Sequence, residues 1–278
     1  SAGSTLVISA FLGLTSLAVY QNYYYIVTSA SSIVGVVFTA CMAGIGNSII
    51  TETKEKNFLD FGKFSFVSLW IIGFCTCCIL ALCQPFMELW VGKELMLGFF
   101  AVACFAVYFF VYNITAMLCT YKDAAGIWHE DRFRPLATSL ANIVLSIALV
   151  TPLGVYGVAL ATPLSQAVVG VPWLLRNLFT YLFDGSMMRE YVKKIMLYTA
   201  LTAAGSGICY AACSAVTLPP AQTLIFRAFV CFLVFNVFYL ACTCKSRDFR
   251  SSLEIVQRMT KGRIAPPKST TGIDEEQR

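Results

Sequence analysis

Long apolar runs separated by short polar segments are the main pattern of this chain. No charged residue occurs before Glu52, and residues 136–175 and 195–226 are also uncharged. A helix that crosses a bilayer needs about 20 mostly apolar residues, so these stretches are long enough for membrane-spanning helices. A membrane β-barrel would instead alternate apolar and polar residues in short segments. The pattern therefore predicts an all-α fold, a polytopic bundle of transmembrane helices.

Eight spans fit the apolar runs. Residues 1–51 are too long for one span at about 1.5 Å per residue, and we expect a break within residues 13–16. The sequence Pro-Leu-Gly at 152–154 should divide a later run into two helices, and Pro163 should kink the second of them. The expected spans are residues 3–16, 18–48, 64–83, 95–120, the two halves of 136–175, 195–217 and 223–244.

Basic residues fall on one side of this series of spans. Of the 20 Lys and Arg residues, 18 lie in alternate connections or in the tail, and only Lys93 and Arg227 lie elsewhere. Cytoplasmic loops carry such an excess of Lys and Arg, which predicts a multi-pass protein of the cytoplasmic membrane with a cytoplasmic C-terminus. We expect a basic loop at Lys54, Lys56 and Lys63, and an external segment at residues 84–93.

Two parts are predicted: a transmembrane domain over residues 1–244 and a basic tail over residues 245–278. In the tail, apolar residues at helical spacing predict an amphipathic helix on the inner leaflet. They are Phe249, Leu253, Val256 and Met259. The chain begins inside an apolar stretch with no signal-peptide pattern, so we expect it to be a fragment or an artificially trimmed chain.

Composition supports the membrane interpretation and disfavours metal chemistry. The mean hydropathy is +0.72 and only 13% of residues are charged, more apolar surface than one soluble core can hide. Most of the 12 Cys residues lie inside apolar runs, where Cys acts as a small hydrophobe. The single histidine, His129, lies in a charged loop. We therefore expect no metal site and no cofactor.

The charged side chains also limit the function classes. The predicted external connections are short and offer only Glu88, Lys93 and Glu94 as charged groups, so an enzyme is not expected. None of the 15 carboxylates falls within a predicted span. Ion-coupled transporters usually carry an intramembrane carboxylate. Any coupling residue should therefore be another type of residue or lie outside this sequence.

Neutral polar residues inside the spans are the candidates for binding. A transporter of a sugar-bearing lipid needs hydroxyl and amide groups along its lumen. The alternative is hydrogen bonding between helices. Arg176 and Arg227, both placed near span ends, are the nearest candidates for an ionic contact. The proposed substrate-binding residues are Asn22, Tyr24, Asn113, Asn142, Gln166 and Arg176.

The loop at residues 121–135 packs charges of both signs between two spans. An ion-pair network that locks the helix pair is the favoured interpretation. Contact with anionic lipid or a partner is the alternative. Small residues at helix-packing spacing should allow close approach of helices, as at Ser29, Ser32 and Gly35 or at Gly154 and Gly157.

Several short motifs resemble Wzx-type polysaccharide and oligosaccharide flippases in the same order, over about residues 1–240. They are Gly13-Leu14 followed by Tyr20-Gln21-Asn22-Tyr23-Tyr24, then Gly46-Asn47, Leu89-Trp90-Val91-Gly92, Asp123–Gly126, Asp131-Arg132 with Pro135, and Asn142. This family belongs to the multidrug/oligosaccharidyl-lipid/polysaccharide exporter superfamily. The resemblance implies the second lobe of a two-lobed, MATE-like transporter with about eight membrane helices in this part.

The resemblance also implies a function. The protein would move undecaprenyl-diphosphate-linked oligosaccharide units across the membrane by alternating access. Its partners would be the lipid-linked oligosaccharide, membrane lipids and other polysaccharide-assembly proteins, without nucleic acid. One departure is that members often have an Asp just before the equivalent of Leu6-Val7-Ile8-Ser9, whereas residues 1–5 contain no acid.

Two other functions fit the same sequence. One is a cation-coupled multidrug antiporter of the same superfamily. The other is a membrane scaffold that transports nothing and docks a glycan-assembly complex through the basic tail.

Overall fold

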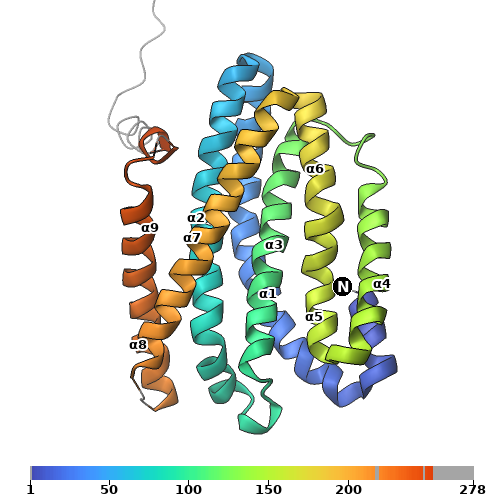
Figure 1. The fold of residues 1–278 in the computed structure, drawn as a ribbon, viewed down its shortest axis with the longest axis vertical. Coiled ribbons are helices and arrows are strands. Elements are labelled where there is room, and N and C mark those ends of the chain that lie inside the picture. The colour runs from blue at the N-terminus through green and yellow to red at the C-terminus, as the bar shows by residue number, and fades with distance from the viewer. Residues whose placement is uncertain (1, 217–218, 247, 253–278) are drawn as a thin grey trace, which may run out of the picture.

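The structure, a computed structural model, describes residues 2–216, 219–246 and 248–252. Every element within these residues is helical (Figure 1), which confirms the all-α bundle. The helices are α1 (Ala2–Thr51), α2 (Lys54–Trp90), η1 (Lys93–Leu95), α3 (Phe99–Ala124), α4 (Arg134–Leu153), α5 (Val155–Ser165), η2 (Gln166–Gly170), α6 (Val171–Asn177), η3 (Leu178–Leu182), α7 (Gly185–Ser214), α8 (Pro220–Val230), η4 (Cys231–Phe235) and α9 (Asn236–Thr243).

Seven helical stretches in the described residues are long and apolar enough to cross a membrane. The first includes two of the predicted spans, because α1 is interrupted at Gly13. Gly13 has φ 83° and ψ 172°, a conformation that is almost restricted to glycine. The break was predicted within residues 13–16, and the structure confirms it. The short first piece runs beside α4 (Figure 1), where Gly3 approaches Ile143.

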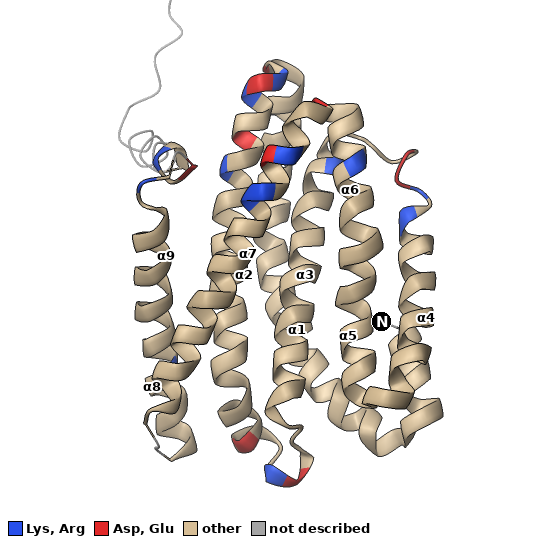
Figure 2. Cartoon of the chain, in the orientation of Figure 1, with Lys and Arg blue, Asp and Glu red and all other residues tan. Residues whose placement is uncertain are grey.

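Charged residues gather at one end of the bundle (Figure 2). We call it the basic end; it holds the connections at residues 52–53, 125–133 and 183–184. The opposite, charge-poor end holds the connection at 91–98, the end of α7 and the start of α8 (Figure 1). In the described residues this arrangement agrees with the one-sided charge pattern of the sequence.

Helix α2 extends beyond the predicted span at both ends. Lys54, Lys56 and Lys63 lie in its first turns, so the predicted loop there is wrong. The side chain of Thr53 caps this helix by accepting a hydrogen bond from the backbone N of Lys56 at 3.4 Å. At the other end the helix continues through Pro85 to Trp90 rather than ending at residue 83.

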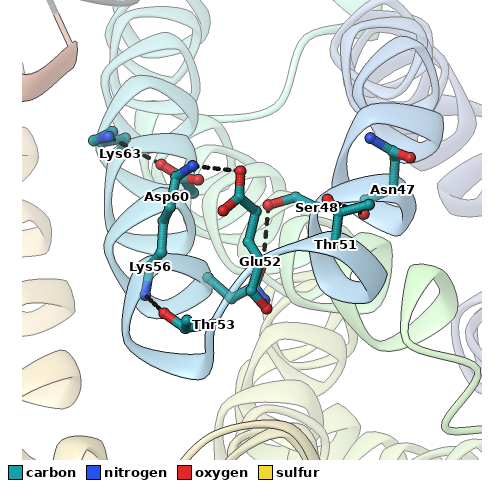
Figure 3. Close-up of polar contacts among 9 residues, drawn as sticks. Asn47, Ser48, Thr51, Glu52, Thr53, Lys56, Asp60 and Lys63 are labelled. Atoms are coloured by element: carbon teal, nitrogen blue, oxygen red, sulfur yellow. Dashed lines mark hydrogen bonds and ion pairs between the residues drawn. The ribbon is translucent and has the colours of Figure 1, made fainter.

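Polar contacts close the short connection between α1 and α2 (Figure 3). Ser48 Oγ donates to Asn57 Oδ1 at 2.9 Å across the two helices. Lys56 pairs with Glu52, and Lys63 Nζ lies 2.9 Å from Asp60 Oδ1. These contacts explain why helical structure begins again directly after residue 53.

Glycines allow the helices to pack closely at specific points. A Cβ at Gly157 would lie 2.2 Å from the carbonyl oxygen of Leu149, so α5 can lie against α4 only with glycine there. A Cβ at Gly73 of α2 would lie 2.7 Å from Thr202 Oγ1 of α7. Nothing lies within 4 Å of a Cβ at Gly35, so close packing there, which we expected, is not seen.

The helical stretch from Val155 to Leu182 contains two π-helical segments, at Gln166–Gly170 and Leu178–Leu182. Pro163 lies inside α5, and a π-helical turn follows at Gln166–Gly170. A proline cannot donate to the carbonyl four residues before it, so the helix adjusts its hydrogen bonds nearby. Near the predicted kink at Pro163 the structure therefore has a π-helical turn, which begins three residues later.

The start of the tail is attached to the bundle at the basic end. Asp248 accepts hydrogen bonds from Lys194 Nζ at 3.1 Å and Tyr198 Oη at 2.8 Å. The ring of Phe249 lies 6.3 Å from that of Phe66 in α2. The rest of the predicted amphipathic helix lies outside the described residues.

All 12 cysteines are free thiols. Four cysteines of α2, α7 and η4 are almost fully buried where these helices pack together: Cys77, Cys209, Cys213 and Cys231. No group of His, Cys, Asp and Glu side chains with an arrangement suited to a metal ion occurs in the described residues.

Candidate functional site

A polar groove lies on the exposed face of α1 near the charge-poor end. Its volume is about 490 Å³. Most of its lining comes from one face of α1, and Trp90, the last residue of α2, completes it. The lining residues are Gln21, Asn22, Tyr24, Tyr25, Thr28 and Trp90.

An apolar groove of about 400 Å³ adjoins the polar one. It runs between α1, α2 and α8, and the two grooves share the side chains of Tyr25 and Trp90. These two rings lie 6.4 Å apart. Leu82 and Phe86 of α2 and Leu224 of α8 supply apolar walls. A surface suited to hydroxyl and amide groups therefore continues directly into one suited to hydrocarbon.

Contacts within the chain engage some of the polar groups of the first groove, since Thr28 Oγ1 donates to the backbone oxygens of Tyr24 and Tyr25 at 2.9 and 3.1 Å. Asn22 makes no hydrogen bond to another described residue, whereas Gln21 donates to Thr5 Oγ1 at 3.3 Å. Tyr25 is 65% exposed and Trp90 is 48% exposed. A helix face that contacts only lipid gains nothing from amide and hydroxyl groups. This face of α1 is therefore suited to a polar ligand or to water.

The tyrosine cluster at the start of the long part of α1 serves two roles. Tyr20 and Tyr23 are buried, and Tyr23 Oη accepts a hydrogen bond from the backbone N of Leu97 at 3.0 Å. Tyr24 stacks on Tyr20 and lines the polar groove, with Tyr25 beside it. Half of the cluster packs the helix, and the other half faces the groove.

The six predicted binding residues do not form one site. Only Asn22 and Tyr24 line the same groove. Asn113 is buried between α1 and α3 and donates to Ser31 Oγ at 3.0 Å. Asn142 is buried between α4 and α5 and donates to Thr162 Oγ1 at 2.9 Å. Asn113 and Asn142 therefore make hydrogen bonds between helices in the structure, which was the alternative to a role in binding.

Gln166 and Arg176 lie away from the grooves. Gln166 Oε1 lies over Gly170, 2.3 Å from where a Cβ of that residue would be, and has no hydrogen-bond donor in the described structure. The side chain of Arg176 is exposed in α6, toward the basic end. Neither residue can reach a ligand held at Trp90 in this conformation.

Four residues that line the polar groove were not predicted as binding residues from the sequence: Gln21, Tyr25, Thr28 and Trp90. The signals were present, because Tyr25 ends the tyrosine cluster and Trp90 belongs to the Leu-Trp-Val-Gly motif. A run of neighbouring residues does not reveal which of them face outward. That depends on how α1 is rotated against α2 and α3.

The charged loop at residues 121–135 forms a buried ion-pair network. Asp131 accepts from Arg134 Nε at 2.8 Å and from Asn177 Nδ2 at 3.3 Å, and it lies 3.4 Å from Lys122 Nζ. Lys122, Asp131 and Arg134 are each at most 9% exposed. The network joins α3, α4 and α6, in agreement with the favoured interpretation that this loop locks the helices.

No family model, curated protein or solved structure matches this chain. The two grooves provide shape, hydrogen-bonding groups and apolar surface. They offer a place to bind an amphiphilic molecule inside a membrane.

Proposed function

We propose that this chain is part of a flippase that moves undecaprenyl-diphosphate-linked oligosaccharides across the cytoplasmic membrane. The observation that carries the proposal is the pair of joined grooves. A lipid-linked oligosaccharide has a head rich in hydroxyl groups and a long hydrocarbon chain. The polar groove at Asn22 suits the head, and the apolar groove at Leu82 suits the chain.

Aromatic side chains at the junction support a sugar ligand. Trp90 and Tyr25 present ring faces and polar edges at the place where the two grooves meet. Such side chains combine a large apolar area with a hydrogen-bonding group. The ordered motifs shared with Wzx-type flippases support the same proposal, since Asn22, Tyr24 and Trp90 belong to them.

The proposed orientation follows from charge. With the basic end in the cytoplasm, the chain obeys the positive-inside rule, and the grooves lie near the outer leaflet. The head of the lipid would leave the protein there. The C-terminal tail would remain cytoplasmic, where polysaccharide-assembly proteins can reach it.

The test is a clean deletion of the gene in its native host. We expect loss of surface polysaccharide and accumulation of lipid-linked units on the inner leaflet, both restored by the complete gene on a plasmid. Normal surface polysaccharide, in a strain without a second copy of such a gene, would contradict the proposal. Exchange of cationic dyes for Na⁺ or H⁺ by the purified protein, without an effect on glycan, would instead favour the antiporter.

A further inference from the structure

Arg227 lies deeper in the bundle than its sequence position suggested. It follows the start of α8 at Pro220 by seven residues, about 10 Å along the helix. Its Nη1 donates to the backbone oxygen of Ala81 at 2.9 Å. Ala81 precedes the end of α2 at Trp90 by nine residues, which again corresponds to about 13 Å. Arg227 therefore lies about two turns inside α8, which begins three residues before the predicted span.

A proline explains why the carbonyl of Ala81 is available. In a regular helix this oxygen would accept from the backbone N–H four residues later, but that residue is Pro85. The guanidinium of Arg227 replaces the missing donor and ties α8 to α2. A carbonyl group needs only a donor, however, and a neutral side chain could provide one.

The positive charge of Arg227 has no partner of opposite sign in the described structure. None of the ion pairs there includes Arg227, and its Nε is buried without a hydrogen-bond acceptor. A charged side chain inside the hydrocarbon region is costly, and such residues usually mark binding sites or transport paths. An anionic ligand would supply both the missing charge and the missing acceptor.

Two residues close to this charge line the apolar groove, although Arg227 itself does not. Leu224, one turn before Arg227 in α8, lines the groove, and so does Leu82, the residue after Ala81. We infer that Arg227 binds the phosphate group of a lipid whose hydrocarbon chain occupies this groove. The inference rests on the proposed function. It adds a binding site for the phosphate group while the lipid head lies inside the membrane. Arginine forms charge-assisted hydrogen bonds with phosphate oxygens.

Pro85 also provides a way to separate the two roles of Arg227. In a Pro85→Ala variant the backbone N–H of residue 85 can satisfy Ala81, so Arg227 is no longer needed there. Lys93→Gln is the matched control, because Lys93 is a cation at the same end of the bundle whose side chain is 81% exposed. Arg227→Gln is then introduced into the wild-type and Pro85→Ala backgrounds.

The measurement is the dissociation constant of undecaprenyl diphosphate for the full chain in phosphatidylcholine nanodiscs. We expect Pro85→Ala and Lys93→Gln to bind within about twofold of the wild type, and Pro85→Ala/Arg227→Gln to bind at least about tenfold more weakly, as loss of a charge-assisted hydrogen bond predicts. Arg227→Lys should retain most of the affinity. Equal affinity in Pro85→Ala and Pro85→Ala/Arg227→Gln, or no binding by the wild type, would overturn the inference.

Nanodiscs that contain phosphatidylglycerol identify the source of the phosphate. If this lipid competes with undecaprenyl diphosphate in the wild type but not in Arg227→Gln, the site accepts lipid phosphates in general. If it does not compete, the site selects the isoprenoid carrier. Both results support binding at Arg227. Full translocation by Pro85→Ala/Arg227→Gln would overturn the inference about Arg227 but not the proposed flippase. Binding of the lipid by the wild type without translocation would overturn the proposed flippase but not the inference.

Discussion

At the scale of single residues, burial decides which polar groups hold the bundle together and which can bind a ligand. Asn113, Asn142 and Asp131 are polar side chains of the interior, and each has a partner on another helix. Asn22 and Tyr25 lie on an accessible face of α1. Side chains with similar chemistry therefore have different roles because their surroundings differ.

Replacing Trp90 by Ala should weaken binding of a lipid-linked oligosaccharide. An aromatic contact contributes about 0.5–1.5 kcal/mol beyond its buried area, so we expect an increase in the dissociation constant of about two- to tenfold. Phe100→Ala is the control, because Phe100 is an exposed aromatic residue of α3 outside both grooves. Equal effects of the two substitutions would argue against a binding role for Trp90.

Asp131→Asn should destabilise the protein strongly. It leaves the buried cation Arg134 with a neutral partner and Lys122 with Asp123 alone, and removing one member of a buried pair costs about 3–5 kcal/mol. In Glu52→Gln the pair with Lys56 is half exposed, so the loss should stay below about 1 kcal/mol. Thermal unfolding in detergent measures both. A similar shift for both variants would contradict the buried network.

At the scale of helices, the sequence predicted where membrane helices exist better than where they end. Gly13 and the Pro-Leu-Gly sequence at 152–154 mark real breaks, because backbone geometry there is local. The predicted ends of α2 were wrong. A capping residue and helix packing extend this helix beyond the apolar run at both ends. Charge patterns describe the membrane boundary, and a helix can continue beyond it.

Gly73→Ala should loosen the packing of α2 against α7 and η4. The added Cβ would lie 2.7 Å from Thr202 Oγ1 and 3.1 Å from the Phe235 ring. Such overpacking costs about 1–3 kcal/mol. In the same helix, Gly62→Ala meets nothing within 4 Å and should be neutral or stabilising by up to about 1 kcal/mol. Apparent melting temperatures in detergent compare them, and a stabilised Gly73→Ala would contradict the close contact.

At the scale of the whole molecule, the two ends of the bundle differ in charge, which predicts its orientation. A protease site inserted between Lys93 and Glu94 should be cut by protease added to intact spheroplasts. A matched site inserted between Asp184 and Gly185 should be cut only after the membrane is ruptured. Cleavage in the reverse order would show that the basic end faces outward.

The sequence by itself determined the membrane bundle, the break at Gly13 and the side on which basic residues gather. These properties depend on hydrophobicity, length and backbone freedom, which are local. Tertiary structure alone decided that Trp90 meets Tyr25 and that Arg227 reaches Ala81, 146 residues away. Such contacts depend on how each helix is rotated against its neighbours, and many different rotations are compatible with one apolar pattern.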